Sequence, residues 1–176
     1  MKKWWLRYSV AGLVFGALFW HYFNGLGHLW GAVTVDVDNN WFLSAVFLML
    51  FLFIILGVWA LPAILPGLVE YRRSQSRRSA VLAAMVACVS AVLGYYVYYV
   101  LLLALFGLPH MDHLLVWQAN SGTFWQEWAA IFPSLIVADF LKWTAVSLIG
   151  SGLAGGVGVW LYSAWVERRR VGQLAG

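Results

Sequence analysis

The sequence predicts an all-α integral membrane protein: a four-transmembrane-helix bundle with both termini cytoplasmic and an extra amphipathic or re-entrant helix on the outer side. Of its 176 residues, 63% are hydrophobic and only 10% are charged, whereas charged residues make up about a quarter of a typical soluble domain. Such a chain lacks the polar residues to cover a water-facing surface. We therefore expect residues 1–176 to form one polytopic domain in a bacterial-type inner membrane.

The placement of the positive charges supports this topology. Ten of the eleven Lys and Arg residues fall at the two ends of the chain or in the polar stretch 70–79, and only Lys142 lies elsewhere. Four crossings bring these three groups to one side, which the positive-inside rule makes the cytoplasm. We interpret the arginines as topology and lipid-headgroup anchors: Arg72, Arg73, Arg77, Arg78, Arg168, Arg169 and Arg170. Since topology accounts for the net charge of +4, no nucleic-acid partner is expected.

The first predicted span covers residues 9–30, and we expect it to be retained as a helix, because no small-residue cleavage motif follows it. Gly12 and Gly16 form a small-xxx-small pair, which lets another helix approach closely. His21, Asn24 and His28 are three and four residues apart, so a helix places them on one face.

The second and third spans are predicted at residues 41–69 and 80–106. Pro62 and Pro66 follow an unbroken apolar run, and proline removes a helical donor, so we expect a kink or break there. The third span carries four tyrosines between positions 95 and 99. They either pack through their rings or line a polar cavity, and ring packing is the favoured interpretation.

The outer-face helix is predicted at residues 124–143, and the fourth span at residues 144–165. Asp139 and Lys142 are three residues apart and can pair on a helix. The fourth span is rich in small residues that strip bulk from more than one helix face, which favours tight packing against neighbours. These candidate packing residues are Gly150, Gly152, Ala154, Gly155, Gly156 and Gly158.

One group of residues looks chemical, and this topology places all of it on the outer side. It comprises His21, His28, His110, Asp112 and His113. Imidazoles with a carboxylate can hold a divalent metal such as zinc or copper, and two facing histidines can ligate a haem iron. A proton-relay role is a further alternative. The simplest interpretation is that these histidines are interface anchors without a ligand.

Three functions remain open from the sequence. The first is a small non-catalytic subunit or accessory protein of a larger membrane assembly for transport, secretion, conjugation or respiration. The second is a histidine-ligated metal or haem protein in electron transfer, and the third is a small transporter or channel that acts as an oligomer. No nucleophile–base arrangement or HExxH motif is present, so the sequence favours a non-enzyme. The expected partners are membrane lipids and either other membrane subunits or further copies of the chain.

Overall fold

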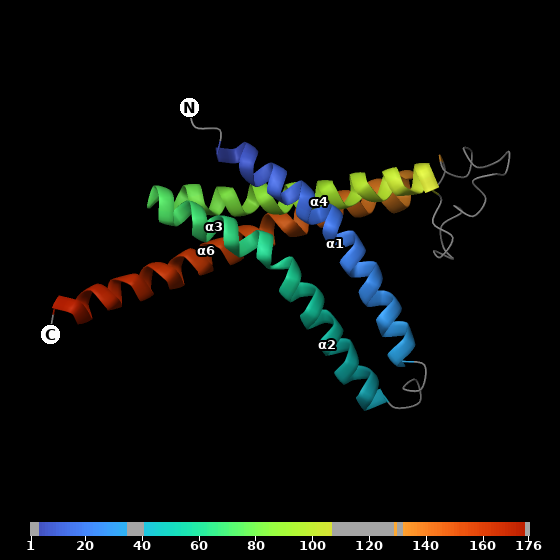
Figure 1. Ribbon diagram of the computed structural model, residues 1–176, viewed down its shortest axis with the longest axis horizontal. Coiled ribbons are helices and arrows are strands. Elements are labelled where there is room, and N and C mark those ends of the chain that lie inside the picture. Colours follow the sequence, from blue (N-terminus) through green and yellow to red (C-terminus); the bar gives the residue numbers. More distant parts are fainter. Residues whose placement is uncertain (1–3, 35–40, 107–128, 130–131, 175–176) are drawn as a thin grey trace.

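The computed structural model describes residues 4–34, 41–106, 129 and 132–174, and these residues form helices without any strand. Figure 1 shows their arrangement. The elements are α1 (Trp4–Thr34), α2 (Trp41–Trp59), α3 (Leu61–Ser74), α4 (Arg77–Phe106), the π-helix η2 (Phe132–Val137) and α6 (Ala138–Leu174).

In the described part of the chain, three helical stretches are long and apolar enough to cross a membrane. They are Trp41–Ser74, Arg77–Leu102 and Ala138–Val166. The all-helical class that the sequence predicts is therefore confirmed, and these three stretches are compatible with a helical membrane protein. Helix α1 has 31 residues, but His21, Asn24 and His28 make its second half less apolar. The fourth span and the cytoplasmic placement of both termini stay predictions.

The break predicted near Pro62 is present, and one predicted boundary differs. The predicted span 41–69 consists of two helices that meet at Ala60, and Pro62 lies in the first turn of α3, where a missing backbone N–H costs little. Helix α3 is capped by Gln75, whose φ of 53° is left-handed and whose N–H bonds the Tyr71 carbonyl at 2.8 Å. Residues 138–143, predicted to belong to the outer-face helix, instead begin α6 without interruption.

Hydrogen bonds between α1 and its successors show that α1 is antiparallel to α2 and α3. Tyr8, near the start of α1, bonds Glu70 near the end of α3. Tyr22, further along α1, bonds the carbonyl of Ile54 in α2. Helix α1 therefore meets progressively earlier parts of the α2–α3 pair.

Helices α4 and α6 are also antiparallel to each other. Gly155 of α6 lies against Ala84 near the start of α4, and the Phe140 ring packs on Tyr96 further along α4 with centroids 5.7 Å apart. The chain direction thus alternates from α1 to α2–α3, to α4 and to α6. This alternation is the one that the predicted four-segment topology requires.

Helix α4 lies at the centre of the packed region and contacts α1, α3 and α6. Its buried side chains are mostly small, and each exposes at most 1% of its surface. They are Ala80, Ala83, Ala84, Ala87, Cys88, Ala91 and Val92. Small side chains permit close backbone approach, so packing here rests on dispersion between helix backbones rather than on bulky side chains.

The closest approach is between α1 and α4. A Cβ atom added at Gly12 would overlap the carbonyl oxygen of Ala87, and one added at Gly16 would overlap that of Ala91. From the other side, Gly94 of α4 lies directly on the backbone of α1. Only glycine fits these three positions without a shift of one helix. Gly12 faces Ala87 and Gly16 faces Ala91, so the residue numbers rise together and the two helices run parallel.

Beyond this crossing, the second half of α1 leaves α4 and runs beside α2, and Figure 1 shows both extending away from the other helices. We call residues 21–34 of α1 together with α2 the α1–α2 arm. Helix α2 contains no buried residue. Aromatic contacts hold the C-terminal end of α2: Phe15 and Phe19 of α1 pack on Trp59 at ring-centroid distances of 6.0 and 4.8 Å.

The α1–α4 contact generates a stability prediction. Gly16→Ala forces the two backbones apart, and overpacking of this kind costs about 1–3 kcal/mol, so the variant should unfold at lower temperature than the wild type. Gly25→Ala in the same helix is the matched control, because no described atom lies within 4 Å of its added Cβ. A thiol-reactive dye measures unfolding, since Cys88 is buried in the folded protein. Equal melting curves for the two variants would contradict the assigned contact.

Candidate functional site

Of the five residues in the predicted metal or haem site, His21 and His28 lie on α1. The other three, His110, Asp112 and His113, fall outside the described residues. The His21 ring nitrogen Nε2 lies 2.6 Å from the Tyr98 hydroxyl of α4, within hydrogen-bond distance. His28 is exposed on the α1–α2 arm, which diverges from the end of α4 in Figure 1.

The surroundings of His21 are aromatic. Trp20 is buried and meets His21 and Tyr98 edge-on, with ring centroids 5.1 and 5.8 Å away. An imidazole hydrogen-bonded to a phenol in this setting can pass or hold a proton, and its orientation is fixed by the neighbouring rings. The described residues contain no group of three His, Cys, Asp or Glu side chains that could hold a metal ion.

The tyrosines of α4 take part in ring contacts. Tyr95 packs on Tyr96 and Tyr99 at 5.3 and 6.4 Å, and Phe19 of α1 lies 6.4 Å from Tyr95. The favoured interpretation, ring packing, therefore describes these side chains. Their hydroxyl-bearing edges give the crossing of α1 and α4 a mixed apolar and polar character.

A second cluster lies at the opposite end of the packed helices, where the first part of α1 and the last part of α6 each contact the α3–α4 hairpin. We call it the basic end. Glu70 exposes only 5% of its surface there, and the Tyr8 hydroxyl donates a hydrogen bond to its Oε2 at 3.0 Å. Burial and this bond raise the pKa of Tyr8 to about 12, against the partly offsetting charges of Arg73 and Arg7.

Sequence reasoning missed the Tyr8–Glu70 pair, because its members are 62 positions apart. The available signal was Glu70 itself, the only acid in a stretch with four arginines. A carboxyl that escapes pairing with those arginines and is buried instead needs a donor from another element. Tyr8 supplies it and ties α1 to α3.

The predicted anchor arginines occupy the same end. Arg72 donates from Nε to the Tyr162 hydroxyl of α6 at 3.0 Å, and Arg77 donates to the Ser163 hydroxyl at 3.4 Å. Arg168 lies about one and a half turns beyond these partners on α6. Arg73 and Arg78 are exposed, and α6 continues through Arg169 and Arg170 to Leu174. The basic residues therefore gather at one end of the packed helices.

The predicted packing residues of α6 divide into two groups. A Cβ atom built on Gly155 would lie 3.0 Å from the Ala84 side chain of α4. Cβ atoms built on Gly152 and Gly158 would lie 3.9 Å from Met85 and 3.8 Å from Ile64. By contrast, no described atom lies within 4 Å of a Cβ built at Gly150 or Gly156. Ala154 is half-buried. One small-residue face of α6 therefore packs within the chain and another remains open.

Comparison with known protein families, with curated proteins and with solved structures finds no match to this chain.

The buried Tyr8–Glu70 bond can be tested by removing its donor. Tyr8→Phe leaves a buried carboxyl unsatisfied, which costs about 1–3 kcal/mol, so the free energy of unfolding should fall. Tyr22→Phe on the same helix is the control, since its hydroxyl makes only a long 3.5 Å bond to a carbonyl that α2 exposes. Denaturant unfolding in detergent compares them. An equal effect of both substitutions would refute a special role for Tyr8.

The raised pKa of Tyr8 also predicts a pH dependence. The folded protein holds the phenol proton more tightly than the unfolded chain, whose tyrosine pKa is about 10. The stability that Tyr8 contributes is therefore complete below pH 10 and declines as pH rises from 10 through 12. The difference in unfolding free energy between wild type and Tyr8→Phe should shrink over this interval. A difference that stays constant across it would contradict the pKa shift.

Proposed function

We propose that this chain is a small, non-catalytic multi-pass subunit or accessory protein of a larger assembly in a bacterial-type inner membrane, with both termini in the cytoplasm. One observation carries the proposal: α2 is very apolar, yet none of its residues is buried by the rest of the chain. Helices associate in lipid through packing and interhelical hydrogen bonds. The strongly exposed side chains of α2, such as Met49 and Phe53, therefore remain available for contact with another chain.

The polar residues of the α1–α2 arm support the same proposal. His21, Asn24 and His28 share one face of α1, and His21 and His28 are exposed. Polar side chains are costly against lipid tails and are typically satisfied by neighbouring helices or by water. His21 and Asn24 have partners in α4 and α1, and a helix of another chain beside the arm would in addition shield this polar face from lipid tails.

The open glycines are a third source of support. Gly57 of α2 and Gly150 and Gly156 of α6 have no described atom within 4 Å of a would-be Cβ. At Gly12 and Gly16, in contrast, the chain itself provides the closely approaching helix. The same residue type thus occurs in both filled and unfilled contacts, and the unfilled positions suit helices of other subunits or of further copies.

Photo-crosslinking tests the assembly directly. A photoreactive amino acid placed at Met49 or Phe53 of α2, which expose 72% and 76% of their surface, should give adducts with another membrane chain. Leu18 of α1 exposes a similar 64% and lies outside both the arm and the open glycine face of α6, so it serves as the matched control and should react mainly with lipid. Adducts are detected by gel shift and identified by mass spectrometry. Adducts that are absent from α2, or as frequent at Leu18, would contradict a docking role for the arm.

The same purified sample separates this proposal from its two alternatives. A subunit of this kind is colourless and requires partners for activity. A Soret band or a stoichiometric metal that His21→Ala removes would instead establish the histidine-ligated haem or metal protein. Solute flux through vesicles that contain only this chain would establish the transporter or channel.

A further inference from the structure

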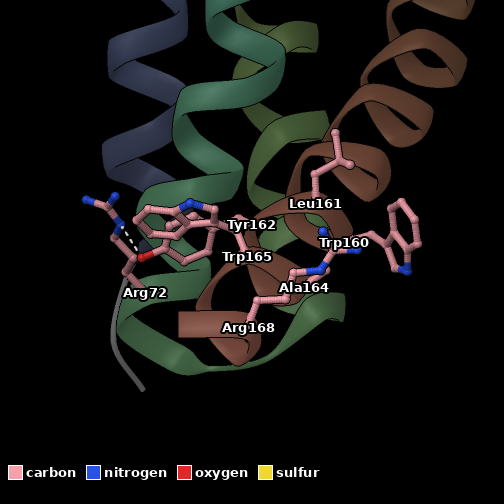
Figure 2. Close-up of a pocket in the computed structure, with 7 residues that line it drawn as sticks. All are labelled: Arg72, Trp160, Leu161, Tyr162, Ala164, Trp165 and Arg168. Carbon is pink, nitrogen blue, oxygen red and sulfur yellow. Dashed lines mark hydrogen bonds between the residues drawn. The ribbon is translucent and has the colours of Figure 1, made fainter. Parts of the chain in front are cut away.

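An open pocket of about 660 Å³ lies at the basic end, between α3 and the last part of α6 (Figure 2). Two arginines and a set of aromatic and aliphatic side chains line it: Arg72, Trp160, Leu161, Tyr162, Trp165 and Arg168. We propose that this pocket binds an anionic phospholipid whose headgroup carries two phosphates. The inference rests on the pocket alone and does not depend on the proposed subunit role.

The first step is charge. Arg72 and Arg168 come from different helices. Among the described side chains, the ion pair that forms is Lys142–Asp139, so neither arginine is paired with a described carboxylate. Two arginines that line one pocket without an acidic partner among the described side chains create a site for an anion. Arginine suits phosphate in particular, because its planar N–H fork matches two phosphate oxygens.

The second step is preorganisation. The Arg72 guanidinium lies over the Tyr162 ring, 5.0 Å from its centroid, while its Nε donates to the Tyr162 hydroxyl at 3.0 Å. These two contacts fix the group and leave its terminal nitrogens free to donate. Figure 2 shows those nitrogens pointing away from Tyr162. A guanidinium that is already held loses less conformational entropy when it binds a phosphate.

The third step is the separation of the two arginines. Figure 2 draws the side chain of Trp165 between those of Arg72 and Arg168, and both arginines line the pocket. A lipid with two phosphates joined by a short linker, such as cardiolipin, can present one phosphate to each arginine.

The fourth step is depth. The candidate span Ala138–Val166 ends just before Arg168, so the pocket lies where the apolar part of α6 meets water, which is the level of lipid headgroups. Trp160 and Leu161 are more than half exposed beside it and provide an apolar surface for acyl chains. A soluble anion would leave this surface uncovered, whereas a phospholipid covers both the charged and the apolar parts.

Native mass spectrometry of the full chain in a neutral detergent tests the proposal, with cardiolipin, phosphatidylglycerol and phosphatidylcholine as probes. The wild type should bind cardiolipin at least about tenfold more tightly than phosphatidylcholine, as expected for loss of charge-assisted hydrogen bonds, with phosphatidylglycerol between them. The double substitution Arg72→Gln with Arg168→Gln should abolish this preference. Inorganic phosphate at the same concentration as the lipid should not compete.

The matched control is Arg73→Gln with Arg78→Gln, which removes the same number of charges from the basic end but outside the pocket, and it should keep the preference. Arg168→Gln alone guards against misfolding, because Arg168 makes no hydrogen bond or ion pair with a described residue; it should lose part of the preference. Equal weakening by both double substitutions would show general electrostatics and overturn the site. Equal binding of phosphatidylglycerol and cardiolipin would overturn the two-phosphate assignment, and competition by inorganic phosphate would overturn the lipid assignment.

Discussion

The contact between α1 and α4 is the constraint on which the rest of the structure depends. At Gly12, Gly16 and Gly94 the two helix backbones approach so closely that a single added carbon atom would overlap the opposite main chain. In a bilayer, apolar side chains gain little by leaving lipid for protein, so close backbone packing has to supply the association energy. The α1–α4 contact fixes α1 parallel to α4, and the turn after Ser74 fixes α3 antiparallel to it. The position of Tyr8 beside Glu70, and hence the basic end, follows from these two constraints.

The same contact explains why the two ends of α1 behave differently. Its first half lies on small residues of α4 and is fixed there, whereas from Trp20 onward the α4 surface carries tyrosines, whose rings hold the helices further apart. His21 lies at this transition, with its ring nitrogen against the Tyr98 hydroxyl. Beyond it α1 runs with α2 away from the other helices (Figure 1). The arm is thus a consequence of a change in side-chain size along α4.

The sequence was sufficient for features that depend on local pattern and insufficient for those that depend on pairing. The prediction of a helical membrane protein follows from composition and apolar runs; the structure confirms the helices, and three of them are long and apolar enough to cross a membrane. The break near Pro62 follows from the missing backbone donor, although the junction at Ala60 required the structure. Spacing identified Gly12 and Gly16 as packing residues but could not name α4 as their neighbour. The bonds of Glu70 to Tyr8 and of Arg72 to Tyr162 span 62 and 90 positions, and no periodicity encodes such distances.

The arginines at the basic end show how one residue type can serve both topology and recognition. The positive-inside rule concerns only how many cations lie on a side, so it treats Arg72 and Arg78 alike. The structure separates them: both are exposed, but Arg72 is also held by the ring and the hydroxyl of Tyr162. Orientation needs charge but no fixed geometry, while recognition of a phosphate needs both. The orientation of the chain in the membrane does not require a guanidinium that is fixed on an aromatic residue of a second helix. This fixed geometry is the physical reason to assign a ligand to the basic end.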